Sequence, residues 1–188
     1  MKYFFTSDLH LGHARIINYT NRPFKNVGEM DYVLMRNWNS RVKPEDVVFF
    51  VGDFCFKSAG GLKAQEYRQQ LKGNIIFLAG NHDNNNSLKT CIHDISIYLG
   101  GKHLLLVHRP EESAYGYDLS LIGHVHDAWK FRTLKFRKYP AWDVCNVGVD
   151  AFGRPVTINE ILDEYQIWKK TGIQHLAWVV ADEKPQGL

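Results

Sequence analysis

The sequence has few of the features that would place the protein outside the ordinary globular classes. No run approaches the ~18 apolar residues of a membrane span, and the apolar start of the chain ends at Asp8, too early for a secretory signal. The three cysteines (Cys55, Cys91 and Cys145) are odd in number and lack metal-finger spacing. We therefore expect a reduced, cytoplasmic protein without a membrane partner. The formal net charge of +3 is too small to indicate nucleic-acid binding by itself.

Internal repeats, low-complexity tracts and Pro/Ser-rich linkers are also missing. A chain of 188 residues has the length of one domain and can bury most of its apolar surface. We therefore expect a single domain over residues 1–188. The sequence says nothing of the oligomeric state.

Short apolar runs predict the strands: residues 2–6, 46–51, 74–79, 102–107 and 119–122, with weaker candidates at 142–147 and 175–180. Because several runs are apolar on both faces, central strands covered on both sides are expected. Helical patterns are found at residues 26–38, after an N-cap at Asn26, at 62–71, and from 157 to a stop at Gly172. Strands interleaved with helices indicate an α/β fold, and the strand-rich stretch 92–150 predicts a mixed sheet or two sheets.

Polar residues follow five of these runs at the point where each strand ends. The blocks are Ser7-Asp8-Leu9-His10, Gly52-Asp53, Gly80-Asn81-His82-Asp83, His108-Arg109 and Gly123-His124-Val125-His126. Each block alone is a weak indication, since a lone histidine is more often structural and Asn-His-Asp suits a turn. Ligands of open α/β sheets bind beyond the carboxyl ends of the strands, where such loops converge. Five blocks in this position together predict a binding site.

The same five blocks, in this order, resemble the signature of the calcineurin-like metallophosphoesterases. The resemblance spans residues 8–126 and is highly specific. It implies an α/β fold, a four-layer α/β/β/α sandwich of two mixed β-sheets flanked by helices, with a dimetal site at the C-terminal ends of the strands. It also implies a metal-dependent hydrolase of phosphate esters.

Carried over block by block, the resemblance gives a ligand set for two divalent metals. The first metal would take Asp8, His10, Asp53 and His126, and the second Asp53, Asn81, His108 and His124, with Asp53 bridging. Mixed carboxylate, imidazole and amide ligands suit Mn²⁺, Fe or Zn²⁺, and the ligand types do not choose among these metals. We expect two divalent ions, Mn²⁺ first, with Fe, Zn²⁺ or Ni²⁺ as alternatives. Two metals, two carboxylates and a bridging hydroxide leave a positive site, which favours phosphate. The hydroxide is expected to attack phosphorus.

His82 adjoins a metal ligand without belonging to the ligand set, so we expect it to be the general acid that protonates the leaving oxygen. Asp83 could orient its ring. For substrate binding, the candidates are Asn81 through its side-chain N–H, Arg109, and Arg22 in the loop after His10. An ion pair at the rim is an equal alternative for Arg109, and a surface or loop-fixing role an alternative for Arg22.

The expected substrate is a small phosphate ester, with phosphodiesters favoured because the chain is small and few arginines are available to grip a terminal dianion. The basic residues of 129–139 argue weakly for a substrate of nucleotide type. Phosphomonoesterase, protein phosphatase and nuclease activities use the same chemistry and stay open. A non-catalytic scaffold on this fold is disfavoured by the complete set of blocks. The basic segment, residues 129–139, carries five positive charges and three Phe or Trp residues. It could cover the site and bind a nucleotide or an extended nucleic acid, or be a solvated hairpin edge.

Overall fold

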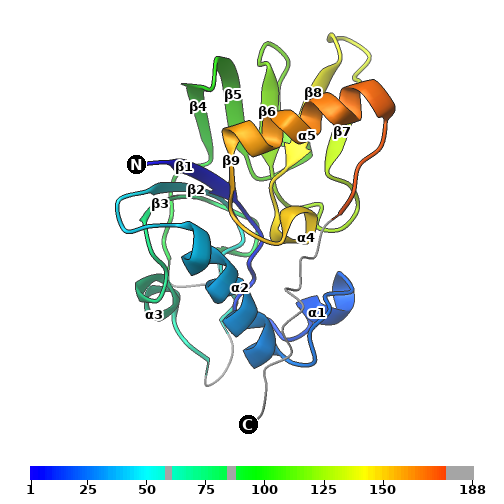
Figure 1. Cartoon of the computed structure of the whole chain (residues 1–188). Coiled ribbons are helices and arrows are strands. Elements are labelled where there is room, and N and C mark those ends of the chain that lie inside the picture. The colour runs from blue at the N-terminus through cyan, green and yellow to red at the C-terminus, as the bar shows by residue number, and fades with distance from the viewer. Residues whose placement is uncertain (58–60, 84–87, 177–188) are drawn as a thin grey trace.

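Two mixed β-sheets pack face to face in the computed structural model of the chain (Figure 1), which describes residues 1–57, 61–83 and 88–176. The strands are β1 (Tyr3–Thr6), β2 (Val47–Val51), β3 (Asn74–Leu78), β4 (Asp94–Leu99), β5 (Lys102–Val107), β6 (Leu119–Ile122), β7 (Phe131–Leu134), β8 (Trp142–Asn146) and β9 (Val156–Thr157). The helices are α1 (Ile16–Tyr19), α2 (Val27–Arg41), α3 (Ala64–Gln69), the 3-10 turn η2 (Pro110–Glu112), α4 (Val149–Phe152) and α5 (Ile158–Thr171).

The first sheet has the order β3-β2-β1-β9, in which the first three strands are parallel and β9 is antiparallel. The second has the order β4-β5-β6-β8-β7, with a parallel centre and an antiparallel strand at each edge. Apolar side chains alternate between the two faces of the central strands, because successive residues of a strand point in opposite directions. Phe5 of β1 faces the second sheet, whereas Phe4 faces the helices.

Helices α2 and α3 cover the outer face of the first sheet (Figure 1). Helix α2 begins where the sequence predicts, because the Asn26 side chain accepts the backbone N–H of Glu29 at 2.9 Å. Its buried stripe, Met30, Leu34 and Trp38, packs on β1 and β2. None of the helices in the described ranges has the length and apolar character needed to cross a membrane.

Helix α5 lies beside β9, against the inner face of the second sheet. It begins at the N-cap Thr157 and ends at Gly172, whose φ of 70° closes the last turn. Trp168 of this helix stacks on Phe131 of β7, with ring centroids 5.6 Å apart. In the part of the chain that the structure describes, loop residues Ala114, Tyr117, Val125 and Trp129 pack on the outer face of the second sheet. There Trp142 donates its indole N–H to Ser113 at 2.8 Å.

The prediction of an α/β fold with two mixed sheets flanked by helices is confirmed. Helix α5 packs beside β9, on the side of the second sheet that faces the first sheet. In a regular four-layer sandwich it would instead cover the outer side of the second sheet. Strands β4, β7 and β9 were not expected. The weak strand candidate at 175–180 begins in a loop, and its residues 177–180 lie outside the described residues.

Candidate metal centre

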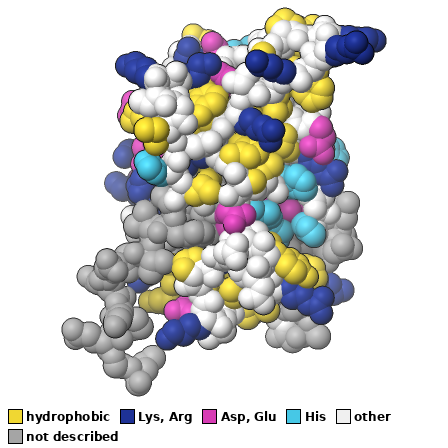
Figure 2. Space-filling view, turned by 90° about the vertical axis from the view of Figure 1, so that its right-hand side faces the viewer, with side chains coloured by type: hydrophobic (Ala, Val, Ile, Leu, Met, Phe, Trp, Pro, Cys, Tyr) yellow, Lys and Arg dark blue, Asp and Glu magenta, His cyan; other side chains and the backbone are white. Residues whose placement is uncertain are grey.

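The loops that follow β1, β2, β3, β5 and β6 converge at one edge of the two sheets. Backbone hydrogen bonds tie them to one another: Asp8 N–H donates to Gly52 O at 3.0 Å, and Gly123 N–H donates to His108 O at 3.0 Å. Figure 2 shows histidine side chains gathered beside acidic ones on one face of the molecule. The predicted binding site is therefore assembled from segments far apart in the sequence.

Left-handed backbone is concentrated at the predicted ligands. Among the described residues, seven that are not glycine have a positive φ, and five of these belong to the predicted ligand set: Asp8 (56°), His10 (50°), Asp53 (61°), His124 (69°) and His126 (48°). Such backbone costs about 1–3 kcal/mol per residue and persists only where the surroundings enforce it. The strands therefore end in turns that direct these side chains back over the sheet edge at an energetic cost.

Two glycines allow the close approach of these loops. A side chain at Gly123 would place its Cβ 2.5 Å from Asp8 Oδ2 and 2.6 Å from Ser7 Oγ. Gly52 has a φ of +88°, and a Cβ there would collide with the His108 ring. Neither position accepts a larger residue without moving a predicted ligand.

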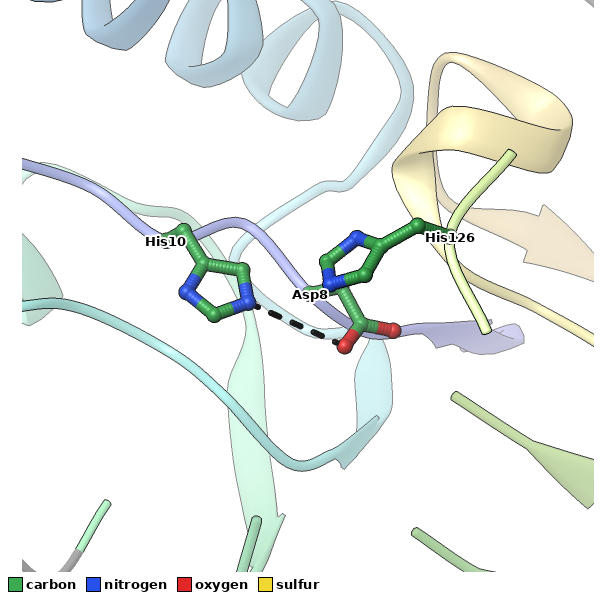
Figure 3. Close-up of side chains that lie close together, drawn as sticks. All are labelled: Asp8, His10 and His126. Atoms are coloured by element: carbon green, nitrogen blue, oxygen red, sulfur yellow. Dashed lines mark ion pairs between the residues drawn. The ribbon is translucent and has the colours of Figure 1, made fainter. Parts of the chain in front are cut away.

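Asp8, His10 and His126 form the first cluster of donor atoms. One ligand atom from each lies within 4.8 Å of the others. His10 comes from the loop after β1 and His126 from the loop after β6, and the two rings come together beside the Asp8 carboxylate (Figure 3). The Asp8 carboxylate also accepts the Ser7 hydroxyl at 2.5 Å and the backbone N–H of His124 at 3.0 Å, which fix its orientation.

Asp53 lies between the two halves of the site. Its Oδ2 is 3.5 Å from His10 Nε2 and 3.4 Å from His108 Nε2, while its Oδ1 accepts the backbone N–H of His82 at 2.8 Å. Asp53 Oδ2 and His10 Nε2 are buried without a hydrogen-bond partner among the described residues. Unpaired buried polar atoms cost about 1–3 kcal/mol each. A carboxylate oxygen between two imidazole nitrogens is a donor arrangement that suits two metal ions, so these residues fit a two-metal centre.

The remaining predicted ligands adjoin His108. Asn81 Oδ1 lies 3.0 Å from His108 Nε2, and the His124 ring is 5.3 Å from the His108 ring between centroids. Asp8, Asp53 and His108 also bring ligand atoms within 4.8 Å of one another. Asn81, His82, His124 and His126 are half-buried, whereas Asp8, His10, Asp53 and His108 are buried. The centre thus has a buried floor and a rim that a ligand can reach.

Electrostatics favour a cation here. Burial lowers the pKa of His10 and of His124, which favours the neutral form of both rings, the form that binds a metal. Although burial acts in the same direction at His108, the carboxylates of Asp53 and Asp8 raise its pKa to about 9. The carboxylates therefore create a negative potential that favours a cation at this place.

His82 and Asp83 adopt different roles in the described contacts. The His82 ring is 5.2 Å from the His10 ring between centroids, at the rim of the centre. The Asp83 carboxylate accepts the backbone N–H groups of Gly80 and Asp53 at 2.8 Å and that of Phe54 at 3.0 Å. These contacts brace the turn that carries Asp53, and the orientation of His82 by Asp83 stays a prediction.

The two arginines predicted as substrate contacts lie in different surroundings. Arg22 is buried, and its guanidinium contacts Asp150 and two backbone carbonyls of the loop after β1, which agrees with its alternative as a loop-fixing residue. Arg109 is partly exposed and pairs with Glu111 at 3.8 Å, which agrees with its alternative as a rim ion pair.

The basic segment does not lie over the centre as a cover. Its turn follows Leu134, which pairs with Trp142 at the start of β8, whereas Asn146 at the other end of β8 approaches the centre. Lys130 is buried, pairs with Glu164 at 2.7 Å and lies 4.2 Å above the Phe152 ring. Residues 135–139 are exposed, so the turn of this segment fits the alternative of a solvated hairpin, whereas Lys130 and Phe131 at its start are buried.

Sequence reasoning missed two polar residues, Asn146 at the end of β8 and Asp150 in α4. Asn146 donates its side-chain N–H to His126 O at 2.7 Å, and Asp150 lies 2.7 Å from His126 Nδ1. The segment Asn146-Val147-Gly148-Val149-Asp150 follows an apolar run and contains a glycine and polar residues, as three of the five recognised blocks do. That shared pattern could have identified it.

A sequence profile of the calcineurin-like phosphoesterases matches residues 1–182. The chain belongs to this family. It is 39% identical to an uncharacterized protein of Methanocaldococcus jannaschii over 127 residues, which cover 66% of this chain and 69% of that protein. The Gene 66 protein of Mycobacterium phage L5 is 26% identical over 190 residues, covering 85% of this chain and 91% of the phage protein.

Among solved structures, a protein of unknown function from Aquifex aeolicus has a TM-score of 0.62 and 24% identity, covering 86% of this chain and 97% of that one. This likeness supports the fold alone. The resemblance inferred from the five blocks is confirmed at the level of the family, a family of dimetal-dependent phosphoesterases.

Proposed function

We propose that this protein is a metal-dependent phosphodiesterase in which His82 is the general acid. The observation that carries the proposal is the position of Asp53 Oδ2, without a hydrogen-bond partner among the described residues and 3.4–3.5 Å from the nitrogens of His10 and His108. Two divalent ions, of which Mn²⁺ is the first candidate, would be held by seven residues: Asp8, His10, Asp53, Asn81, His108, His124 and His126. When bound, they supply Lewis-acid activation of water and of the phosphoryl group.

The residues of the chain divide the remaining tasks. Asn81 reaches the rim and presents a side-chain amide to a phosphate oxygen. His82, also at the rim, delivers a proton from its imidazole to the departing ester oxygen. Asp8, Asp53 and His108 form a buried floor that keeps bulk water away from the reacting phosphorus.

A diester is favoured over a monoester by the charges around the rim. A diester carries one negative charge, whereas a monoester dianion needs additional cationic donors. Of the two predicted arginines, Arg22 is buried against Asp150 and Arg109 is paired with Glu111. The phosphodiester substrate class therefore fits the groups that remain at the rim, and a small nucleotide-type diester is the first candidate.

The test compares purified protein loaded with Mn²⁺, Zn²⁺, Fe²⁺ or Ni²⁺ on a nitrophenyl diester, a nitrophenyl monoester, an alkyl diester and a panel of nucleotides. We expect the highest kcat/KM on diesters with Mn²⁺. A metal-replete protein that is inert on the whole panel would overturn the proposal and favour a binding module on the same fold. Faster turnover of monoesters would overturn the diester preference alone.

The role of His82 is tested through the leaving group. In the variant His82→Ala we expect turnover of an alkyl diester to fall by about 10²–10⁴-fold, while the nitrophenyl diester, whose leaving group needs no proton, changes little. The matched control is His103→Ala, since the His103 ring contacts Ser96 at 2.9 Å and lies on β5 outside the ligand set. Wild-type turnover of the alkyl diester by the His82 variant would contradict the assignment.

A further inference from the structure

The buried carboxylate of Asp150 lies between a predicted metal ligand and an arginine. His126 Nδ1 is 2.7 Å from Asp150 Oδ2. Arg22 donates from Nε to Oδ1 and from Nη2 to Oδ2, both at 2.9 Å. Asp150 is completely buried and Arg22 nearly so, whereas His126 reaches the rim. The three side chains form a chain of contacts from the interior to the centre.

The arrangement determines which nitrogen of His126 faces a metal. A carboxylate paired with a guanidinium is ionised and can only accept hydrogen bonds, so His126 Nδ1 must carry the proton that lies between them. In a neutral imidazole with the proton on Nδ1, the lone pair is on Nε2. The ring also cannot turn over without breaking this buried contact. Asp150 therefore fixes both the tautomer and the orientation of His126.

Arg22 connects the same carboxylate to the loop after β1. Its Nη2 donates to Asp8 O at 2.7 Å and its Nη1 to Leu9 O at 2.9 Å. These carbonyls belong to the stretch in which Asp8 and His10 have left-handed backbone. The planar five-donor guanidinium can satisfy the carboxylate and both carbonyls at once, which the ammonium group of a lysine could not do in this geometry.

We propose that Asp150, braced by Arg22, is a positioning residue that directs His126 Nε2 toward the metal position beside Asp8 and His10. This inference rests on the proposed function, since it concerns the same metal centre. A purely structural role is disfavoured by energetics, because a buried ion pair is weak evidence for a gain in stability and hydrophobic replacement is often neutral. Both partners also contact the groups that carry the ligands, and not a remote part of the core.

The variant Asp150→Asn tests the proposal by metal binding. We expect the folded variant to retain one Mn²⁺, while the second binds about 10–100-fold more weakly, the usual effect of losing a partner of a ligating histidine. Electron paramagnetic resonance separates a coupled Mn²⁺ pair from a single ion, and titration calorimetry gives the two affinities.

Glu160→Gln is the matched control. Glu160 binds Arg41 Nη2 through both oxygens, at 2.7 and 2.8 Å, and caps α5 away from the ligands. This variant should bind both ions as the wild type does, whatever its stability. An Asp150→Asn protein that is folded and binds the coupled pair with wild-type affinity would overturn the proposal.

Nitrogen NMR of the wild type loaded with diamagnetic Zn²⁺ keeps the proposal testable if the variant does not fold. The His126 ring should show a proton on Nδ1 and the metal on Nε2, and the reverse assignment would overturn the positioning role. If the wild type itself binds no metal, the proposed function fails. If the wild type binds two ions and Asp150→Asn binds both with the same affinities, only the positioning role fails.

Discussion

The Asp83 carboxylate provides a stringent test of how the centre is held together. It accepts three buried backbone N–H groups, those of Gly80, Asp53 and Phe54, at 2.8–3.0 Å. Asp83→Ala would leave these donors without an acceptor, and each buried unsatisfied group costs about 1–3 kcal/mol. We therefore expect the free energy of unfolding to fall by at least about 3 kcal/mol, a large part of the 5–15 kcal/mol typical of a domain.

Urea unfolding in the presence of a chelator measures this loss without a contribution from bound metal. Mn²⁺ binding should weaken as well, because the turn that carries Asp53 loses its brace. The control Asp163→Ala removes an exposed carboxylate from α5 and should leave both quantities unchanged. A folded Asp83→Ala protein within about 1 kcal/mol of the wild type, with normal Mn²⁺ binding and reduced turnover only, would refute this reasoning and favour orientation of His82.

Three further outcomes are expected. Gly123→Ala, which forces a Cβ to within 2.5 Å of Asp8 Oδ2, should weaken Mn²⁺ binding by about tenfold or more in calorimetry, whereas Gly28→Ala in the first turn of α2 should not. The N–H groups of Lys43 and Lys2 hold the pKa of Asp46 below its usual value. The Asp46 carboxylate therefore stabilises the fold above the pKa of about 3.9 that it has in the unfolded chain, and this contribution is lost as the pH falls through its lower pKa in the folded protein. Asp46→Asn should thus reduce the fall in the free energy of unfolding below about pH 4. Removal of metal by a chelator should lower the Tm. Adding Mn²⁺ at 100 times its Kd should raise the free energy of unfolding by about 2.7 kcal/mol, which calorimetric scans measure.

Local sequence rules predict much of this fold because the decisive interactions are themselves local. The N-cap of Asn26, the capping box of Thr157 and the terminal Gly172 each act within one helical turn, and α2 and α5 begin or end where these residues stand. The five polar blocks are predictable for a related reason. Parallel strands bring their carboxyl ends to one edge, so the residue after each strand is delivered to the site without any long-range information.

The missed elements depend on pairing partners that a single sequence does not identify. Strand β4 alternates between exposed and half-buried residues at a sheet edge, and β9 forms only because Val156 pairs with Phe5 across the first sheet. The contact between Arg22 and Asp150 joins residues 128 positions apart. A lone arginine in a polar loop gives no sign that its guanidinium will be buried, so the sequence left a substrate-binding role and a surface or loop-fixing role open.

The cost of the metal centre explains why so much of the surrounding structure is devoted to bracing it. Five left-handed ligands at about 1–3 kcal/mol each amount to a burden comparable with the whole stability of a domain. The braces are found at these turns: the Asp83 carboxylate on the backbone of Asp53, and the Arg22 guanidinium on the carbonyls of Asp8 and Leu9. Each brace is an ionised group acting on backbone, which is stronger than a neutral hydrogen bond. Because both braces are groups of the protein itself, they contribute to preorganising the ligands for metal binding.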